Sequence, residues 1–284
     1  MIVIIGAGFI GSFLGEYFGD RAVFLEGRYN SLETLEQALA PLNPTVVINC
    51  AVKGNPKSIE ALEEGSADWK EHVQVNVVLP EWLALLGKKL GFRLVHLSTL
   101  MFLDWKGEAS AGGFQEDSVP EITSRTSKYA KMKWQAEQRL VGSDAIIARI
   151  HLPFTWANNP RNLFSRLPGF GVFVEDASSM TCLDDFAEAL DGVLERERVT
   201  GVIHFVNEGA MSFHDIAAHM QSQGLIPEGQ VLPSISLAEL NQVPGAVYQP
   251  QVIAQSAVLS GLFLEMPPLQ ESVLGTLHIM SMKL

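Results

Sequence analysis

Basic residues are scarce in this sequence of 284 residues. Lysine and arginine number 20 against 32 acidic residues, which gives a net charge of −12. A surplus of acid of this size excludes the basic surface that binds nucleic acid or anionic lipid. We therefore expect small molecules as partners, with neither nucleic acid nor membrane among them.

Cysteines are also few. Cys50 and Cys182 lie far apart and outside any C-x-x-C motif, which excludes a disulfide framework and a zinc ribbon. His214 and His219 are five residues apart, a spacing that places them on different faces of a helix. We therefore predict no metal site and, with so little cysteine, a cytoplasmic protein.

The apolar N-terminus, MIVIIGAGFIGSFLGEYF, lacks the features of an export signal and of a membrane span. No basic residue precedes Arg21, although a signal peptide begins with one. A span needs roughly 18 consecutive apolar residues, whereas glycines interrupt this run and it ends at Glu16. What remains is a short buried strand, Ile2 to Ile5, followed by G-x-G-x-x-G at the start of a helix.

Strand and helix patterns alternate through the first half of the chain. Nearly continuous apolar runs recur at 22–25, 45–50, 93–97, 145–150 and 201–206, and helical patterns lie at 31–40, 67–90 and 127–141. Such runs are typical of parallel strands covered on both faces. We therefore predict an α/β fold, a Rossmann-type doubly wound parallel sheet with a smaller C-terminal substrate-binding part.

The alternation weakens after about residue 150, where proline and glycine interrupt it. We assign residues 1–150 to an NAD(P)-binding Rossmann domain and residues 151–284 to a substrate-binding part that partly shares the same sheet. Ligands of open α/β sheets bind at the carboxyl ends of the strands, so the loops that follow the strands should carry the site.

The glycine-rich turn predicts a dinucleotide site, with a purely structural turn as the alternative. Gly6 permits a tight turn, Gly8 lets the backbone approach a pyrophosphate, and Gly11 lets the helix pack closely. Phe9 and Ile10 complete the turn at the helix start.

Glu26 and Arg28 bear on the choice of cofactor. An acid about twenty residues past the glycine turn binds the ribose 2′-hydroxyl of NAD, and Glu26 occupies that position. The guanidinium of Arg28 could instead pair with the 2′-phosphate of NADP. We favour NADP(H), with NAD(H) and plain surface charges as the alternatives.

The stretch SKYAKMKW indicates reductase chemistry. Tyr129 and Lys133 are four residues apart, so they share a helix face, and the lysine should lower the pKa of the phenol. A tyrosine with a lowered pKa can donate the proton that a ketone needs once it has accepted hydride. Thr99 follows an apolar strand and can donate a hydrogen bond to the same oxygen, although a helix cap or turn is the alternative.

With these motifs in this order, the sequence resembles the extended short-chain dehydrogenase/reductases, and within them the dTDP-4-dehydrorhamnose reductase branch. The resemblance rests on VVINCA, VQVNVVLPEWLA and LVHLS. Further along, RIHLPFTWANNPRNLF, SSMTCLDDFAEAL and GVIHFVNEGAMSFHDI resemble the bifunctional UDP-4-keto-6-deoxyglucose 3,5-epimerase/4-reductases of rhamnose synthesis, over roughly residues 1 to 220.

The resemblance implies a role for several residues. Thr99, Tyr129 and Lys133 would form the reductase triad, with Lys133 also holding the nicotinamide ribose. The other implied residues are Asn76, which supports the active site, Asn49, Cys50 and Ala51, which line the cofactor crevice, and Asn158, Asn159, Arg161 and Asn162, which grip a nucleotide-diphosphate sugar. A turn with helix-capping asparagines is the alternative for NNPRN. The resemblance also implies a homodimer, formed through the helices around 68–90 and 127–141.

Met101 departs from the pattern of the bifunctional enzymes, which carry a cysteine there to move a proton during epimerisation. A thioether cannot do this, and no basic residue precedes SSMT as it does in those enzymes. We therefore predict a reductase of the 4-keto group of a nucleotide-linked 4-keto-6-deoxy sugar, with Met101 at the substrate. Phe102 and Leu103 are expected in the core, and a place in the core is the alternative for Met101, with Trp105 close behind.

Two alternatives to this function remain. One is an enzyme that also epimerises the sugar, or another NAD-dependent nucleotide-sugar epimerase or dehydratase. The other is a dinucleotide-binding regulatory subunit, since a shared fold does not decide function. The intact Thr99, Tyr129 and Lys133 argue against the regulatory subunit, because a binding protein does not need the acid.

Overall fold

The computed structural model describes residues 1–104 and 113–283, and the chain forms two compact units from interleaved segments. The first unit comprises Met1–Thr99, Ile122–Arg149 and Glu197–Ile203, and the second comprises Leu100–Glu121, Ile150–Arg196 and His204–Leu284. The division of labour at residue 150, into a cofactor part and a substrate part, stays a prediction.

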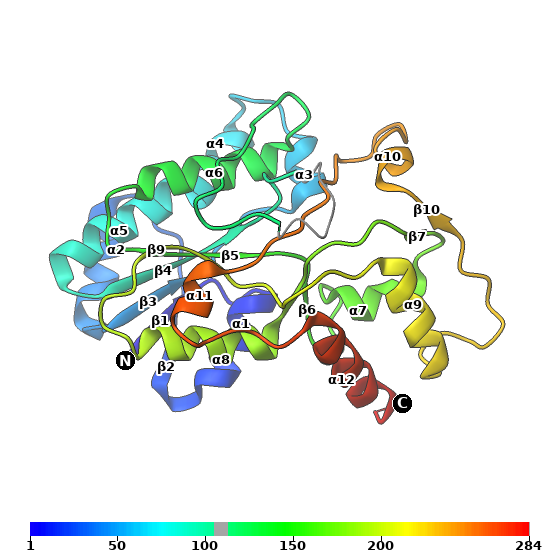
Figure 1. The fold of residues 1–284 in the computed structure, drawn as a ribbon. Helices are drawn as coiled ribbons and strands as arrows, with labels where there is room; N and C mark the ends of the chain where they lie inside the picture. Colours follow the sequence, from blue (N-terminus) through cyan, green and yellow to red (C-terminus); the bar gives the residue numbers. More distant parts are fainter. Residues whose placement is uncertain (105–112, 284) are drawn as a thin grey trace. The chain divides into compact units, whose positions relative to one another are not determined.

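A six-stranded sheet with the order β2-β1-β3-β4-β5-β9 forms the centre of the first unit (Figure 1). Its strands are β1 (Ile2–Ile5), β2 (Ala22–Leu25), β3 (Val46–Asn49), β4 (Arg93–Thr99), β5 (Ile146–Ile150) and β9 (Gly201–His204). The pairs β1-β2, β1-β3 and β3-β4 are parallel. The predicted doubly wound α/β fold is confirmed.

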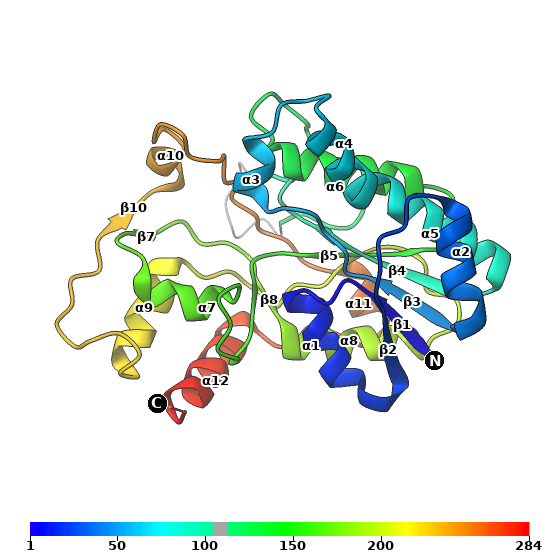
Figure 2. The same cartoon turned by 180° about the vertical axis from the view of Figure 1, so that it is seen from behind.

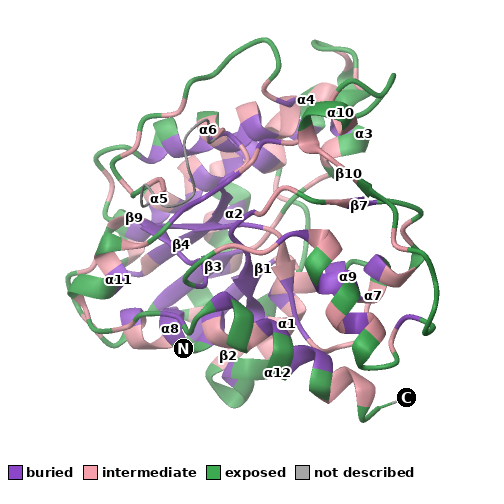
Figure 3. Cartoon of the chain, turned by 45° about the vertical axis from the view of Figure 1, so that its right-hand side comes forward, coloured by how far each residue is buried: buried purple, intermediate pink, exposed green. Residues whose placement is uncertain are grey.

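The parallel register aligns the carboxyl ends of β1, β2 and β3 and places β4 beside them. Ile5 at the end of β1 pairs with Leu25 on one side and with Asn49 on the other, and Asn49 pairs with His96 of β4. Every residue of β1, β3 and β5 is buried, whereas β2 is an edge strand with an exposed centre (Figure 3). The loops after β1, β2 and β3 therefore start side by side, and β4 extends three residues further at the same edge of the sheet, from His96 to Thr99.

The helices of the first unit cover both faces of this sheet. They are α1 (Phe9–Phe18), α2 (Leu32–Leu39), α3 (Pro56–Glu60), α4 (Ala67–Val73), α5 (Leu79–Leu90) and α6 (Lys128–Leu140). Residues of α2, α5 and α6, such as Leu35, Leu83 and Leu140, share a buried cluster with Val3 and Val47 of the sheet. Helix α1 lies on the opposite face (Figures 1 and 2).

The predicted helix at 67–90 contains a turn that is wider than an α-helical turn. Helices α4 and α5 are joined without a break by a π-helical turn, Gln74–Val78. Pro80 sits at the start of α5, lacks an N–H, and would clash with the carbonyl four residues earlier in a regular helix. The wider turn, which contains Asn76, accommodates this proline. Sequence periodicity alone did not reveal it.

The second unit is built from short elements. They are β6 (Pro153–Phe154), α7 (Leu163–Arg166), β7 (Phe173–Val174), β8 (Thr181–Cys182), α8 (Leu183–Leu194), α9 (Phe213–Ser222), β10 (Ser234–Ile235), α10 (Leu237–Leu240), α11 (Ala257–Gly261) and α12 (Leu269–Ser281). A cluster that includes Phe154, Phe164 and Met220 forms its core, and the rings of Phe154 and Phe164 stack at 4.4 Å. Val252, Ile253 and Ala254 are also buried, so the C-terminal part contributes to the packing.

Within the described ranges, no helix has the length and apolar character needed to cross a bilayer.

Gly11 offers a test of how closely α1 approaches the glycine-rich turn. A Cβ at Gly11 would lie 1.9 Å from the carbonyl oxygen of Gly6, which is backbone and cannot move aside. We expect Gly11→Ala to lower the free energy of unfolding by about 1–3 kcal/mol, measured by urea denaturation. Gly275→Ala is the matched control, since nothing lies within 4 Å of that site in α12, and it should stabilise the chain by up to about 1 kcal/mol. Equal effects at both glycines would contradict the close approach.

Candidate functional site

The carboxyl end of β1 leads into the glycine-rich turn. Gly6 has a φ of +97°, a conformation that favours glycine, and a Cβ there would lie 2.6 Å from the backbone nitrogen of Ala51. Gly8 is the N-cap of α1 and provides no side-chain cap, and the first turn, beginning with Phe9 and Ile10, contains no acidic residue. Because helix N-termini attract anions, this turn fits the pyrophosphate of a dinucleotide.

Glu26 and Arg28 follow β2 next to this turn. Because Leu25 pairs with Ile5, Glu26 follows β2 at the same level at which Gly6 follows β1. Both charged side chains are exposed. The acid and the guanidinium are therefore accessible beside the glycine-rich turn.

Two cations, Lys53 and Arg28, act on one carboxylate, that of Glu71. The ammonium of Lys53 donates a hydrogen bond to Glu71 and lies 3.8 Å from Asp68. This hydrogen bond holds the pKa of Glu71 below its usual value, and the charge of Arg28 lowers it further. Lys53 is therefore engaged with two carboxylates, and Arg28 lies within electrostatic range of one of them, Glu71.

The loop after β3 starts with Asn49, Cys50 and Ala51. Asn49 is fully buried; its Oδ1 accepts a hydrogen bond from the Ala51 backbone at 3.1 Å, and its Nδ2 lies 3.1 Å from Nδ1 of His96. Burial raises the pKa of the Cys50 thiol to about 12, although the charge of Lys133 opposes this shift. Cys50 is therefore a neutral thiol at physiological pH and is unsuited to act as a nucleophile.

Asn76 holds this loop from the π-helical turn. Its Oδ1 accepts a hydrogen bond from the backbone nitrogen of Lys53 at 2.9 Å, and its Nδ2 donates to the Lys53 carbonyl at 3.0 Å. The side chain is 1% exposed. Asn76 therefore supports the site by holding the loop after β3. A direct contact of Asn76 with a cofactor stays a prediction.

Lys133 connects α6 to the end of β4. Its ammonium is buried and donates a hydrogen bond to the carbonyl oxygen of Leu97 at 2.8 Å. Burial lowers the pKa of Lys133 to about 8, while the neighbouring Cys50 and Glu137 groups raise it. Lys133 is therefore mostly cationic at neutral pH and neutral in moderately alkaline solution.

The expected lowering of the pKa of Tyr129 is wrong for this structure. Tyr129 is half-buried and packs against the cluster of Ile59, Val77 and Met132. Burial raises the pKa of its phenol to about 12. The physical reason is that desolvation penalises the phenolate, and the ammonium of Lys133 is engaged with a backbone carbonyl.

Thr99 is the last residue of β4 and is 6% exposed. It follows Leu97, which accepts the Lys133 hydrogen bond, by two residues. The β3-β4 register places it at the same sheet edge as Asn49. The first unit therefore brings together the glycine-rich turn, the loop after β3, Thr99, and the α6 face that carries Tyr129 and Lys133.

Sequence reasoning missed three residues behind this arrangement. Ser98, Glu137 and Arg149 are buried and bonded to one another. Two signals could have revealed them. Glu137 continues the four-residue spacing from Tyr129 and Lys133, and Arg149 interrupts an apolar strand, where a charge needs a buried partner.

Leu100, Met101, Phe102 and Leu103 belong to the second unit. Leu100 is fully buried and Met101 is half-buried. Phe102 and Leu103 are 3% and 1% exposed, so their predicted place in the core is confirmed. Trp105 lies outside the described residues. Contact of Met101 with a substrate stays a prediction.

The asparagines of NNPRN divide into two kinds. Asn162 is fully buried, caps α7, and donates hydrogen bonds to the carbonyls of Thr155 and Ala157 at 2.6 and 2.8 Å. Oδ1 of Asn159 accepts a hydrogen bond from the Arg161 backbone at 2.9 Å. The structure thus gives Asn159 and Asn162 turn and cap roles.

The other two residues of this stretch, Asn158 and Arg161, are exposed. Substrate contacts by these residues, as by Asn159 and Asn162, stay a prediction.

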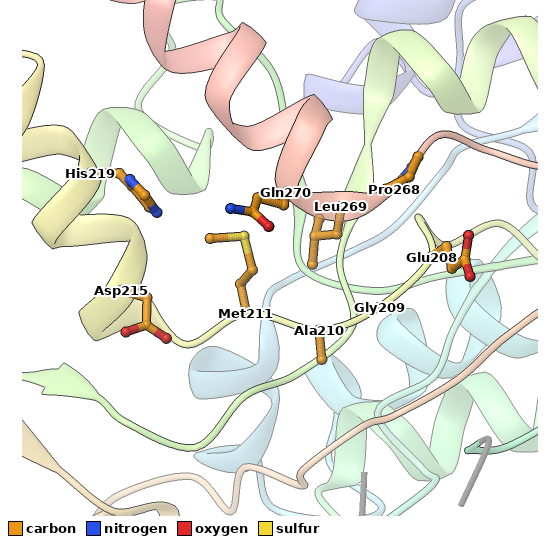
Figure 4. A pocket seen from close by; sticks show the side chains of 9 residues that line it. All are labelled: Glu208, Gly209, Ala210, Met211, Asp215, His219, Pro268, Leu269 and Gln270. Atoms are coloured by element: carbon orange, nitrogen blue, oxygen red, sulfur yellow. The ribbon is translucent and has the colours of Figure 1, made fainter. Parts of the chain in front are cut away.

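A pocket of about 560 Å³ lies elsewhere in the second unit (Figure 4). Asp215 and His219 of α9 and the start of α12 at Leu269 and Gln270 line it together with the chain around Met211. None of the predicted site residues lines this pocket, and we do not include it in the candidate site. Within residues 1–104 and 113–283, no group of three or more His, Cys, Asp or Glu side chains could hold a metal ion.

Two solved structures share this fold. The UDP-rhamnose synthase of Acanthamoeba polyphaga mimivirus matches with a TM-score of 0.86 and 20% identity over 99% of each chain. The dTDP-4-dehydrorhamnose reductase of Bacillus anthracis, in complex with NADP, matches with a TM-score of 0.79 and 18% identity over 97% of this chain and 96% of that one. At these identities the likeness shows the fold alone.

A relative identified by sequence is the trifunctional UDP-glucose 4,6-dehydratase/UDP-4-keto-6-deoxy-D-glucose 3,5-epimerase/UDP-4-keto-L-rhamnose-reductase of Arabidopsis thaliana. It is 27% identical over 223 residues, which are 74% of this chain. The match spans about a third (32%) of the length of the plant enzyme.

The family model described as RmlD substrate binding domain matches residues 25–251, well over half of the chain. The resemblance stated from sequence motifs is thereby confirmed. The chain belongs to the family of the RmlD substrate binding domain.

Proposed function

We propose that this protein is an NAD(P)H-dependent reductase of the 4-keto group of a nucleotide-linked 4-keto-6-deoxy sugar. One observation carries the proposal. Lys133 is bonded to Leu97, two residues before Thr99, and it shares a face of α6 with Tyr129. This contact supports a site at the end of β4 in which a hydrogen-bond donor, an acid and a cation act together, next to a turn that fits a dinucleotide.

Each of these groups has a part in ketone reduction. The nicotinamide, when bound, supplies the hydride for the carbonyl carbon. The Thr99 hydroxyl donates a hydrogen bond to the oxygen on which negative charge develops, and Tyr129 delivers its phenolic proton to that oxygen. Lys133 provides a positive charge near the Tyr129 phenol while the phenol loses its proton.

The protonation states fit the reducing direction. With a pKa of about 12, the phenol of Tyr129 carries its proton throughout the physiological range. With a pKa of about 8, Lys133 is charged at neutral pH. An acid that is always protonated, beside a cation, is suited to deliver a proton to an alkoxide.

The relatives support the substrate class. The plant enzyme that this chain partly matches is named for three activities, one of which is a UDP-4-keto-L-rhamnose reductase. Of these three, we propose the reductase activity alone, because Met101 cannot transfer the proton that epimerisation needs. A homodimer, as the resemblance implies, stays a prediction.

For the cofactor we propose NADPH in preference to NADH. Arg28 places an exposed positive charge just past the end of β2, and a 2′-phosphate is an anion that arginine binds well. The Bacillus anthracis reductase of the same fold holds NADP. Glu26 is the residue that would favour NADH instead.

The first test is oxidation of NADPH and NADH with UDP- and dTDP-4-keto-6-deoxyglucose, each with and without an added 3,5-epimerase. We expect the absorbance of the reduced nicotinamide to fall only when the epimerase is present, because Met101 cannot prepare the substrate. Oxidation without it would contradict the single activity, and product stereochemistry would then distinguish direct reduction from epimerisation. Bound cofactor without turnover in any mixture would favour the regulatory subunit.

Tyr129→Phe tests the acid. Loss of the phenolic proton should lower kcat by about 100-fold or more and leave the affinity for NADPH unchanged, as measured by steady-state kinetics and fluorescence titration. Tyr17→Phe makes the same chemical change on an exposed ring of α1 and should keep wild-type turnover. Full activity of Tyr129→Phe would refute the assigned acid.

Arg28→Ala tests the cofactor preference. Removing a charged partner of the 2′-phosphate should raise KM for NADPH by about 10-fold or more and leave KM for NADH nearly unchanged. Arg21→Ala is the control, because Arg21 lies at the opposite end of β2 over the Phe18 ring. An equal effect of Arg28→Ala on both cofactors would argue against a 2′-phosphate contact.

A further inference from the structure

Glu137 and Arg149 form a buried ion pair in the first unit. Glu137 of α6 and Arg149 of β5 are each 2% exposed. Nε of Arg149 lies 3.1 Å from both carboxylate oxygens of Glu137, and one terminal nitrogen lies 2.7 Å from Oε2. The contact between guanidinium and carboxylate is therefore two-pronged and shielded from water.

The same carboxylate also reaches β4. The hydroxyl of Ser98 donates a hydrogen bond to Oε1 of Glu137. Lys133, one turn earlier on α6, donates to the carbonyl of Leu97. Helix α6 is thus bonded to two consecutive residues of β4 immediately before Thr99.

Stability alone is a poor explanation for this arrangement. A buried ion pair loses the hydration of both charges, and replacing such a pair with apolar residues of similar volume often preserves or increases stability. The other residues of β5, including Ile146, Ile147 and Ile150, are apolar, so apolar packing is compatible with the site. The hydrogen bonds and the ion pair are directional, so the side chains of Ser98, Glu137 and Arg149 must meet in one geometry. These contacts therefore fix the position of α6 relative to β4 and β5.

Glu137 also affects the protonation of Lys133. The groups that act on Lys133 come from its own helix, from the loop after β3 and from β4. Cys50 is a neutral thiol with a pKa of about 12, and burial together with Lys133 holds the pKa of His96 well below its usual value. At neutral pH the negative charge that favours the ammonium therefore comes from Glu137. Arg149, which carries the opposite charge, is engaged with that carboxylate.

We propose that Glu137, held by Arg149 and Ser98, is a positioning residue that sets α6 against the end of β4 and keeps Lys133 in its cationic form. Through this register Thr99, Tyr129 and Lys133 face one carbonyl oxygen, so the inference rests on the proposed reductase function.

Glu137→Gln is the first test, because it preserves volume and removes the charge. We expect kcat to fall by about 10-fold or more, with a smaller change in KM. In the wild type, activity should decline as the pH rises through about 8, where Lys133 loses its proton. In the variant Lys133 loses it more readily, so this decline should move to lower pH by about one unit. Glu137→Asp keeps the charge and should restore the wild-type pH dependence.

A double variant separates positioning from stability. Glu137→Leu with Arg149→Met removes both charges and leaves only the neutral Ser98 hydroxyl without its acceptor, so it should fold with a Tm close to that of the wild type. We expect the same loss of kcat and a smaller shift of the pH profile, because the positive charge of Arg149 is removed together with the carboxylate. A double variant with wild-type stability, kcat and pH profile would overturn the proposal, because the pair would then have only a packing role.

Titration of Lys133 by NMR of ε-¹³C-labelled lysine distinguishes this inference from the proposed function, because it needs no sugar. The signal is assigned by its loss in Lys133→Arg. A lower pKa of Lys133 in Glu137→Gln than in the wild type supports the inference, and an unchanged pKa overturns it. No oxidation of NAD(P)H by the wild type with any of the sugars would overturn the proposed function, whatever the titration shows.

Discussion

The common edge at which β1 to β4 end is the constraint on which the rest of the site depends. Ile5 pairs with both Leu25 and Asn49, so the loops after β1, β2 and β3 start at one level, and β4, in which His96 pairs with Asn49, continues past this level to Thr99. Parallel strands cannot pair in this way without crossover segments, and those crossovers become the helices that cover the sheet. The glycine-rich turn, the charges after β2, the loop after β3 and Thr99 are neighbours for this reason.

Helix α6 must be placed against that edge with a defined rotation and height. Its sheet-facing residues, spaced four apart, achieve this with hydrogen bonds to β4 and an ion pair to β5. Apolar packing tolerates small slides, because it is not directional. Hydrogen bonds to a fixed backbone and to a planar guanidinium do not tolerate such slides. This rigidity suits a site in which the reacting atoms must align to within a fraction of an ångström.

Burial governs the electrostatics of this site more strongly than pairwise attraction does. The pKa of Lys133 falls to about 8 and that of Tyr129 rises to about 12, both mainly through desolvation. The neutral forms are favoured in each case. Glu137 opposes this trend at Lys133, so a buried acid maintains a positive charge where the medium disfavours one.

The sequence by itself determined the class of fold and most of the first unit. The strands at Ile2–Ile5 and Ala22–Leu25 have the expected bounds, and helix α6 begins directly after Ser127, because strand burial and helix capping leave local patterns of residues. The Tyr129 and Lys133 spacing and the glycine-rich turn are local in the same sense. Only the tertiary structure decided the π-helical turn before Pro80, the cap role of Asn162, the raised pKa of Tyr129, and the meeting of Ser98, Glu137 and Arg149. The physical reason is that desolvation and hydrogen-bond partners at each of these positions depend on packing between elements, which no single stretch of sequence contains.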